Sequence, residues 1–446
     1  MKRSAWRYLL KSPDIRNKLL ITIGLLVIFR LAANIPVPGV DRAVIASLAQ
    51  SGGAAGSLFN MLDLLSGGTV SNFSILAMGV YPYITAQIIL QLLMPIIPAL
   101  ERMMRDNPKE GQKWMEKWTM ILTIPMAFLS AFGQINIFNQ MAGSSGTASI
   151  LYYQNGDLLP TLTTIISMMG GTMFGIWIGQ LISEYGIENQ GLSLIIFAGI
   201  VARIPQNIIY IMADVQRGWW MLSLIIVILV LIIFAIVFIQ QGRRNVLVHF
   251  PGRRIGNRQS MSVTSNLPLM VNMAGMIPLI FAQSILTFPA IVASFFLQSA
   301  TTWIKSFATS VYSVFGGSGW IYASLYFLCV VAFTYFYTDV LFTQQDYGEN
   351  LKRQGAKIPN VTAGEATQRY LHKVQQRITL PGAFFLGVVA VLPFILSGTI
   401  FSGESRSAVF LVSAAGLLIV VGVVRDTFNI IEAELKLHGY QEKLLR

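Results

Sequence analysis

Long apolar stretches alternate with short polar, charged or Gly/Pro-rich segments along most of this chain. Each stretch is about 20 residues long, which is the length that an α-helix needs to cross the hydrocarbon core of a bilayer. They predict ten transmembrane helices, an even number that places both ends of the chain on one side of the membrane. The predicted spans cover residues 19–38, 73–97, 118–138, 159–182, 192–213, 219–240, 267–292, 319–342, 378–397 and 407–425.

A polar break, Asp214–Gly218, divides the predicted spans into five and five. An odd number of spans per half gives the two halves opposite topology, as in inverted-repeat membrane proteins. The residues show no internal similarity, so the sequence permits an inverted repeat without demonstrating one. The predicted fold is an all-α polytopic membrane protein with two inverted five-helix halves, residues 19–213 and residues 219–425.

The segments outside the spans are basic. Residues 1–18 mix aromatic, aliphatic and basic residues, as a cytoplasmic amphipathic segment at the membrane interface does, and residues 426–446 are predicted to form a cytoplasmic tail. A basic start followed by an apolar run also resembles a secretory signal peptide. Because Arg30 interrupts that run and residues 34–39 make a poor cleavage site, we favour a retained first span.

One apolar segment, residues 57–68, is short and flanked by glycines. A segment of about 10–14 apolar residues is more often re-entrant or buried than spanning. Non-helical backbone at membrane depth is tolerated only where protein or a water-filled cavity surrounds it. We therefore expect a re-entrant helix between the first two spans.

Composition supports a membrane protein. Of the 446 residues, 54% are apolar and only 12% are charged, and the mean hydropathy is +0.61. Soluble domains carry about 25% charged residues because their surface must stay hydrated. The one cysteine, Cys329, excludes an internal disulfide and fits packing inside an apolar run.

The charge is strongly asymmetric. The predicted connections and tails on one side hold 26 of the 32 Lys and Arg residues, which predicts that this side is cytoplasmic. Two of these connections, residues 241–266 and residues 343–376, are long, polar and basic. They suit docking of a cytoplasmic partner, although a basic loop can also serve only to set the topology.

Reactive groups are scarce in the spans. His249, His372 and His438 all lie outside them, and the chain has no phosphate-binding Gly-x-x-x-x-Gly-Lys-Ser/Thr loop. No predicted span holds an acidic residue clearly at depth, as a proton- or sodium-coupled transporter usually does. A passive conduit without cofactor or metal is therefore favoured over an inverted-repeat secondary transporter, and over an enzyme.

Six ordered segments carry recognisable motifs, and together they extend over most of the chain. They are Gly56–Gly68, Phe73–Ile84, Ile195–Val201, Leu267–Pro278, Leu380–Ala383 and Gly416–Val420. These motifs resemble those of the SecY family, the channel subunits of the bacterial Sec protein translocon. The resemblance implies a channel in the plasma membrane that passes unfolded secretory polypeptides outward and releases transmembrane segments sideways into lipid.

The resemblance also implies partners. These are the small membrane subunits SecE and SecG, the SecA motor or the ribosome on the cytoplasmic loops, nascent secretory and membrane proteins, and lipids. Contact with ribosomal RNA is compatible with rows of arginine. The implied docking residues are Arg243, Arg244, Arg253, Arg254, Arg258, Lys352, Arg353, Lys357 and Arg369.

Three further sites are implied inside the membrane. The pore ring would be Val80, Ile84, Leu192, Ile196, Ile280 and Ile419. The plug would be the re-entrant helix, with Ser57, Leu58, Phe59, Asn60, Met61, Leu62, Asp63, Leu64 and Leu65. The lateral gate would include Thr85, Gln87, Gln91, Gln283, Ser284 and Phe288.

The residues give physical sense to the ring and the gate. Val80 and Ile84, like Leu192 and Ile196, are four apart and so share a helix face. A constriction of aliphatic side chains blocks ions by dewetting. Hydrogen bonds between membrane helices are worth only about 1 kcal/mol each, so a polar seam can open.

The chain departs from the family pattern at two positions. Thr362 stands where the family's motor-coupling arginine is expected, and Met270 stands where a basic residue usually precedes the Val-Asn-x-Ala-Gly motif. Both departures weaken the expectation that the usual motor contacts are kept.

Overall fold

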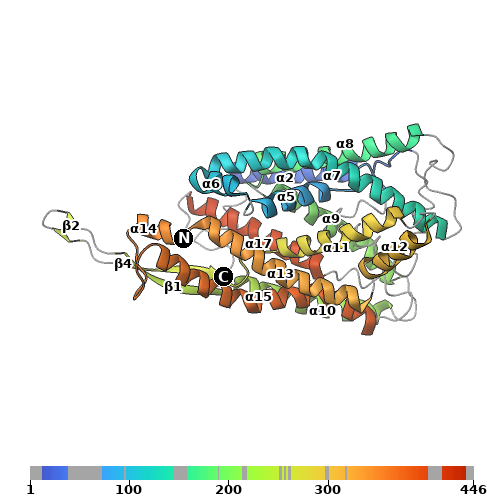
Figure 1. Cartoon of the computed structure of the whole chain (residues 1–446). Helices are drawn as coiled ribbons and strands as arrows, with labels where there is room; N and C mark the ends of the chain where they lie inside the picture. The colour runs from blue at the N-terminus through green and yellow to red at the C-terminus, as the bar shows by residue number, and fades with distance from the viewer. Residues whose placement is uncertain are drawn as a thin grey trace.

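The computed structural model describes most of the predicted spans (Figure 1). The described residues are 13–38, 73–94, 97–144, 158–188, 190–212, 218–250, 254–255, 258–259, 263–296, 301–316, 319–399 and 414–437. The predicted plug, residues 57–65, lies outside them, as do Arg253 and the last predicted residues of the tail.

Helices dominate the described part of the chain. The helices of the first half are α2 (Pro13–Ala32), α5 (Tyr81–Leu93), α6 (Pro98–Asp106), α7 (Pro108–Ser144), α8 (Leu158–Tyr185) and α9 (Gly191–Met212). Those of the second half are α10 (Gly218–Gln241), α11 (Ile277–Phe296), α12 (Thr302–Phe315), α13 (Trp320–Gln345), α14 (Tyr347–Arg353), α15 (Glu365–Thr399) and α17 (Ala414–Leu437).

Each predicted span contains a helix. Within the described residues, five helices are long and apolar enough to cross a membrane, and a sixth is obtained if the bent pair α5 and α6 is one span. The polytopic helical fold is thus confirmed, whereas the count of ten spans remains a prediction. Helices span membranes because every backbone N–H and C=O can be paired within the segment.

Several helices begin or end away from the predicted boundaries. α15 begins at Glu365, well before residue 378, and α17 continues past Arg425 to Leu437. In both helices the backbone hydrogen bonds continue into polar sequence, whereas hydropathy marks only the apolar part. Residues 73–80 form turns rather than the start of a helix, so α5 begins at Tyr81.

The loop predicted over residues 241–266 is a β-hairpin, a local exception to the all-α expectation. Strand β1 (Arg243–Phe250) pairs antiparallel with β4 (Val263–Met270), and β2 (Arg254–Ile255) pairs with β3 (Arg258–Gln259) toward the tip. Val246 and Val248 are buried and Leu247 is exposed, which is the period-2 alternation of a strand. The predicted start of the seventh span therefore belongs to β4, and α11 begins only at Ile277.

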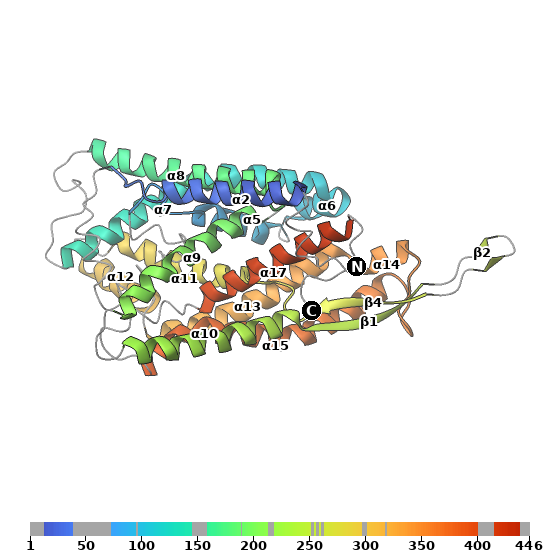
Figure 2. The same cartoon turned by 180° about the vertical axis from the view of Figure 1, so that it is seen from behind.

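The helices form two groups that face each other along their length (Figures 1 and 2). α2, α5, α7 and α8 lie on one side, α10, α13 and α15 lie on the other, and α9, α11 and α17 lie between them. Contacts of α9 with α17 and of α7 with α11 join the groups.

The start of the first span lies beside the end of the last. Ile15 on α2 and Ile431 on α17 line one small cavity. The Lys18 ammonium pairs with the Glu188 carboxylate at 3.2 Å beside it. This arrangement agrees with the predicted placement of both ends of the chain on one side.

Candidate functional site

The turns before α5 position the first two residues of the predicted ring. Gly79 takes a positive φ of 53°, which glycine adopts without strain, and Pro82 lies in the first turn of α5. The Ile84 N–H donates to the Val80 carbonyl at 3.1 Å. Val80 and Ile84 are therefore one helical turn apart, although Val80 lies just outside the helix.

A close approach of α8 to α9 positions the next two. A Cβ added at Gly179 would lie 2.7 Å from the Leu192 Cδ2 and 3.3 Å from the Ile195 Cδ1. The Gly191 N–H, at the start of α9, donates to the Ser183 Oγ at 3.1 Å. Because α8 fixes the start of α9 in this way, Leu192 packs against α8 and Ile196 follows one helical turn later on α9.

The predicted ring residues meet in one apolar cluster. The cluster connects α2, α8 and α9 of the first half with α11 and α17 of the second. Four of the predicted ring residues are only 1–7% exposed, namely Val80, Ile196, Ile280 and Ile419. The other two, Ile84 and Leu192, are partly buried. The structure thus brings together six residues that are far apart in the sequence.

The chemistry of this cluster is uniform. Its other members are aliphatic or aromatic too, among them Leu76, Ile178 and Phe29. Such side chains offer no ligand to an ion and no hydrogen bond to water. They are held together only by dispersion contacts, each worth about 0.1–0.2 kcal/mol per atom pair.

The seam between α5 and the helices α11 and α13 brings together two pairs of polar side chains. Tyr81 lies beside Ser284, whose hydroxyl donates to the Ile280 carbonyl at 2.8 Å, and Tyr337 lies beside Gln91. Around them Ile88, Phe281 and other apolar side chains form a small cluster. Sequence reasoning found Gln91 and Ser284 but missed the two tyrosines, because tyrosine in an apolar run gives no signal of its bonding partner.

The other predicted gate residues differ in their surroundings. The Thr85 hydroxyl donates within its own helix, to the Pro82 carbonyl at 2.9 Å. Gln283 is buried and Gln87 is partly buried, whereas the Phe288 side chain is 54% exposed. The Phe288 side chain is therefore exposed on α11.

A second assembly, which we call the basic platform, lies at one end of the helices. It consists of β1, β4, α14, residues 355–358 and the first turns of α15. Its apolar core contains Val248, Leu269, Phe342, Ile358 and Leu371. Backbone bonds join the two predicted docking loops: the His249 N–H donates to the Lys357 carbonyl and the Lys357 N–H donates to the His249 carbonyl, both at 2.8 Å.

The predicted docking residues fall into three groups. Arg243, Arg244 and Lys357 are exposed and form no ion pair with the described residues. Lys352 and Arg353 pair with Glu349 at 3.7 and 3.5 Å, and Arg369 pairs with Glu365 at 2.7 Å. Arg254 and Arg258 lie on the short strands near the hairpin tip.

Exposed ion pairs of this kind are worth at most about 1 kcal/mol, so an external anion can displace the glutamate from the Lys or Arg side chain.

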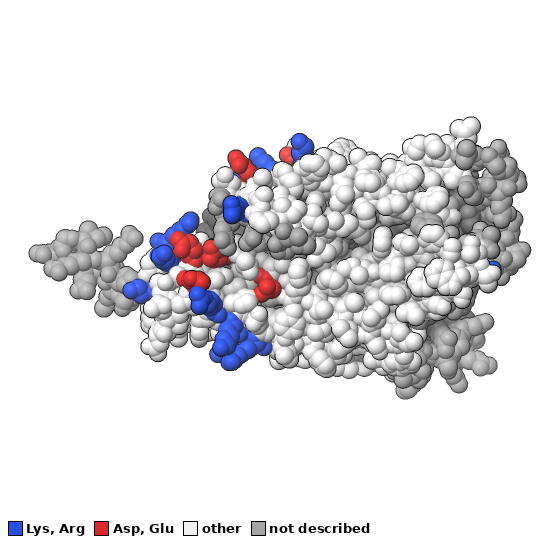
Figure 3. Space-filling model, viewed as in Figure 1, with Lys and Arg blue, Asp and Glu red and all other residues white. Residues whose placement is uncertain are grey.

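Figure 3 shows that Lys and Arg on this face gather at the end with the platform, while the middle of the face is almost free of charge. Partial burial raises the pKa of the Tyr347 phenol on α14 above its ordinary value.

The two departures from the family pattern occupy defined positions in the platform. Met270 ends β4, and its carbonyl accepts a hydrogen bond from the Gln375 amide at 3.1 Å. The Thr362 carbonyl accepts from the Thr367 hydroxyl at 2.8 Å, and its side chain is exposed. Both backbone contacts are available to any residue type, so neither position needs its side chain for the fold.

These features define a class: a polytopic helical membrane protein with an aliphatic cluster between its two groups of helices and a basic platform at one end. Comparison with known proteins agrees. The family model for SecY matches residues 74–428, and the chain belongs to the SecY family.

The relatives match over nearly their whole length. The protein translocase subunit SecY of Escherichia coli (strain K12) is 34% identical over 434 residues, covering 97% of this chain and 94% of the relative. That of Synechococcus elongatus is 36% identical over 422 residues, covering 94% and 91%. The predicted family membership is thus confirmed.

Solved structures share the fold. One described as a protein conducting channel superposes with a TM-score of 0.62 at 17% identity, covering 99% of this chain and 100% of the other. Sec61 in a canine ribosome–channel complex from the endoplasmic reticulum gives a TM-score of 0.58 at 17% identity, with the same coverage. The chain thus has the architecture of the SecY and Sec61 channels.

Proposed function

We propose that this chain conducts unfolded polypeptide across the plasma membrane through the aliphatic ring. The observation that carries the proposal is the meeting of Val80, Ile84, Leu192, Ile196, Ile280 and Ile419 in one apolar cluster. They come from α9, α11, α17 and the start of α5, so the ring joins both halves of the molecule. Curated relatives named as protein translocase subunits support the same function.

The ring closes and opens by a simple physical rule. An aliphatic constriction that offers no hydrogen bonds expels water, and an ion would have to shed its hydration shell to pass. A polypeptide brings its own side chains, which replace the dispersion contacts that the ring residues lose when they separate. The ring therefore seals around a chain and closes again after it.

The lateral exit lies between α5 and the pair α11 and α13. Opening it separates the pairs Tyr81–Ser284 and Gln91–Tyr337, and a polar contact between membrane helices is worth only about 0.6 kcal/mol on average. An apolar helix of a substrate restores the contacts of Ile88 and Phe281. Residues 57–65, which lie outside the described part of the chain, are the proposed plug, as the resemblance to the family implies.

The basic platform supports a cytoplasmic docking role. Arg243, Arg244 and Lys357 suit the phosphates of ribosomal RNA or an acidic surface of a motor protein. The ribosome-bound channel among the structural neighbours supports the first choice, and SecA is the expected motor. SecE and SecG are the expected small subunits. The chain performs no catalytic step, and a partner supplies the work.

Transport into vesicles tests this function. The chain, reconstituted with its small subunits and motor, should move an unfolded secretory polypeptide into a protease-protected lumen. Deletion of residues 57–65 should make the vesicles leaky to small ions while polypeptide transport continues. An inverted-repeat transporter, the rival function, predicts instead that the deletion abolishes solute flux without a leak and that no polypeptide enters.

A further inference from the structure

A pocket lies between α13 and α15 at the end of the molecule that carries the basic platform. It holds about 220 Å³ and opens to the surface. A water molecule takes about 30 Å³ in the liquid, so the pocket has room for a polar group several times larger. Its polar and aromatic wall is formed by Thr338, Asp339 and Phe342 of α13 and by His372, Gln375 and Thr379 of α15.

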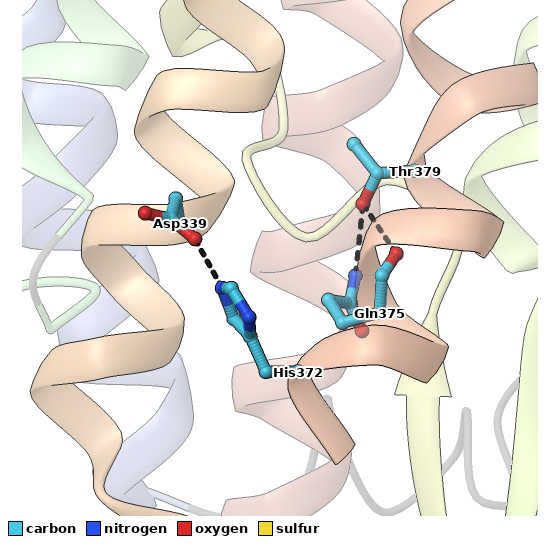
Figure 4. A network of polar contacts seen from close by, with 4 residues as sticks. All are labelled: Asp339, His372, Gln375 and Thr379. Atoms are coloured by element: carbon cyan, nitrogen blue, oxygen red, sulfur yellow. Dashed lines mark hydrogen bonds and ion pairs between the residues drawn. The ribbon is translucent and has the colours of Figure 1, made fainter. Parts of the chain in front are cut away.

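Most polar groups of this wall hold each other in place (Figure 4). The His372 Nε2 and the Asp339 carboxylate form a hydrogen-bonded pair. The Gln375 amide N–H₂ donates to the Thr379 hydroxyl at 3.2 Å and to the Met270 carbonyl at 3.1 Å. These bonds fix the orientation of the Gln375 side chain.

Two oxygens of the wall have no partner. The Gln375 Oε1 and the Thr338 Oγ1 are buried and have no hydrogen-bond partner among the described residues. Gln375 is 1% exposed and Thr338 is 4% exposed. A buried acceptor without a donor is costly, and native proteins rarely leave one unsatisfied. The Asp339 carboxylate beside them can accept further hydrogen bonds besides the one with His372, so the wall is rich in acceptors and a positively charged donor fits it best.

The surface beside the pocket changes from basic to apolar. Lys373 and Arg377 are exposed on the neighbouring face of α15, and they immediately precede the apolar part of the helix. Leu380 and Phe384 follow at 61% and 60% exposure. The Phe384 ring lies 5.7 Å from that of Phe327 on α13, so the apolar strip spans both helices. The pocket, the basic residues and the apolar strip follow one another along the surface in the same order as the headgroup, phosphate and acyl chains of a phospholipid.

We infer that the pocket binds the headgroup of a phospholipid that carries a primary amine, such as phosphatidylethanolamine. The ammonium group donates to the Asp339 carboxylate and, as it displaces the side chains that cover them, to the Gln375 Oε1 and the Thr338 Oγ1. The phosphate lies toward Lys373 and Arg377, and an acyl chain lies along Leu380 and Phe384. The lipid then bridges α13, which borders the lateral exit, and α15, which begins in the basic platform.

The donor count selects the headgroup. An ethanolamine ammonium has three N–H donors for three acceptors. A choline headgroup has the same charge but no N–H, and a glycerol headgroup has hydroxyl donors but no positive charge. A lysine of a partner protein offers the same ammonium, but it has no use for the basic residues and the apolar strip beside the pocket.

Lipid binding to the purified full chain, kept with any membrane subunits that co-purify, tests the inference. The delipidated protein is titrated with dioctanoyl phosphatidylethanolamine, phosphatidylcholine or phosphatidylglycerol, and bound lipid is measured by native mass spectrometry. The ethanolamine lipid should bind most tightly. Asp339→Asn should weaken it about tenfold, and Thr338→Val about threefold, because charged and neutral hydrogen bonds are lost in turn.

Thr334→Val is the matched control. Thr334 lies on α13 one turn from Thr338 and is buried, but its hydroxyl is satisfied by the Val330 carbonyl at 2.7 Å and it does not line the pocket. It should leave lipid binding unchanged. Since the Thr338 hydroxyl makes no bond within the chain, Thr338→Val should also fold normally.

Three results would overturn the inference. Equal affinity for the ethanolamine and choline lipids would show that the N–H donors do not matter. Tightest binding of phosphatidylglycerol would assign the contact to Lys373 and Arg377 alone. Ethanolamine binding that Asp339→Asn and Thr338→Val leave unchanged would place the lipid elsewhere. The pocket would then be left to a lysine of a partner protein.

Discussion

The aliphatic ring and the basic platform are built from opposite kinds of contact. Ring residues of different helices meet only through aliphatic side chains, which form no hydrogen bonds. The platform has a paired hairpin, reciprocal backbone bonds between His249 and Lys357, and an apolar core of its own. The ring is held together by dispersion contacts, which have no preferred direction, whereas the platform is held together largely by directional backbone hydrogen bonds.

This difference suits the two proposed roles, a yielding seal for the ring and a firm docking surface for the platform. Dispersion contacts have little angular preference, so another apolar surface can replace them as the ring opens. Backbone hydrogen bonds weaken steeply when they bend, so the platform keeps its shape under load. A partner that pushes on the hairpin therefore moves residues 355–358 and the start of α15 together with it.

Removing the centre of the platform core should have the largest effect on stability. Phe342 is fully buried, and its ring lies 5.2 Å from Tyr347 and 5.5 Å from His372. Phe342→Ala should lower the free energy of unfolding by about 3–5 kcal/mol, measured by denaturant titration of the purified protein.

Phe336→Ala removes an exposed ring from the same helix and is the matched control, with an expected change within about 0.5 kcal/mol. Equal losses for both variants would contradict a separate platform core.

A polar group in the ring should break the seal. Ile196→Asn places an amide among aliphatic side chains, so the free energy of unfolding should fall by about 2–3 kcal/mol and water should enter. Ion leak from reconstituted vesicles should rise with Ile196→Asn and stay low with Ile196→Val, which remains aliphatic. A tight seal with the asparagine variant would refute the dewetting mechanism.

The backbone bond between the loops should respond to proline but not to loss of charge. Lys357→Pro removes the N–H that donates to His249, at a cost of about 1–2 kcal/mol, whereas Lys357→Ala keeps it. Amide exchange along β1 should accelerate only in the proline variant. Acceleration in both would mean that the Lys357 side chain, and not the bond, holds the hairpin.

The gate pair should give the smallest effect. Ser284→Ala removes the partner of Tyr81 at a cost of about 0.6 kcal/mol, which favours the open seam about threefold. Thiol labelling of Ile88→Cys, in a Cys329→Ser background, reports the opening. Ser313→Ala, which removes a hydroxyl that bonds only to the Ser310 carbonyl on exposed α12, should leave labelling unchanged.

Much of the helical fold could be predicted from the sequence because a membrane helix needs a long apolar run. The ring residues could not be picked out that way, since they are six among many aliphatic residues, and only the resemblance to a family singled them out. Their meeting in one cluster then follows from the turns at Gly79 and from the close contact at Gly179.

The rest was hidden for identifiable reasons. The hairpin escaped because Val246 and Val248 alternate within a run dominated by polar and basic residues. α12 escaped because it is amphipathic and short, with Trp303 and Phe307 exposed. The pair Tyr81 and Ser284 joins helices far apart in the chain, and no local pattern encodes it.

The central claim is that polypeptide passes through the ring. A disulfide crosslink tests it. Ile84→Cys or Ile196→Cys is introduced in a Cys329→Ser background, and a secretory polypeptide that carries one cysteine is stalled midway through export. Phe238→Cys, on the exposed face of α10, is the control. The account predicts crosslinks at both ring positions and none at the control. Normal export with no crosslink at either ring position would contradict it.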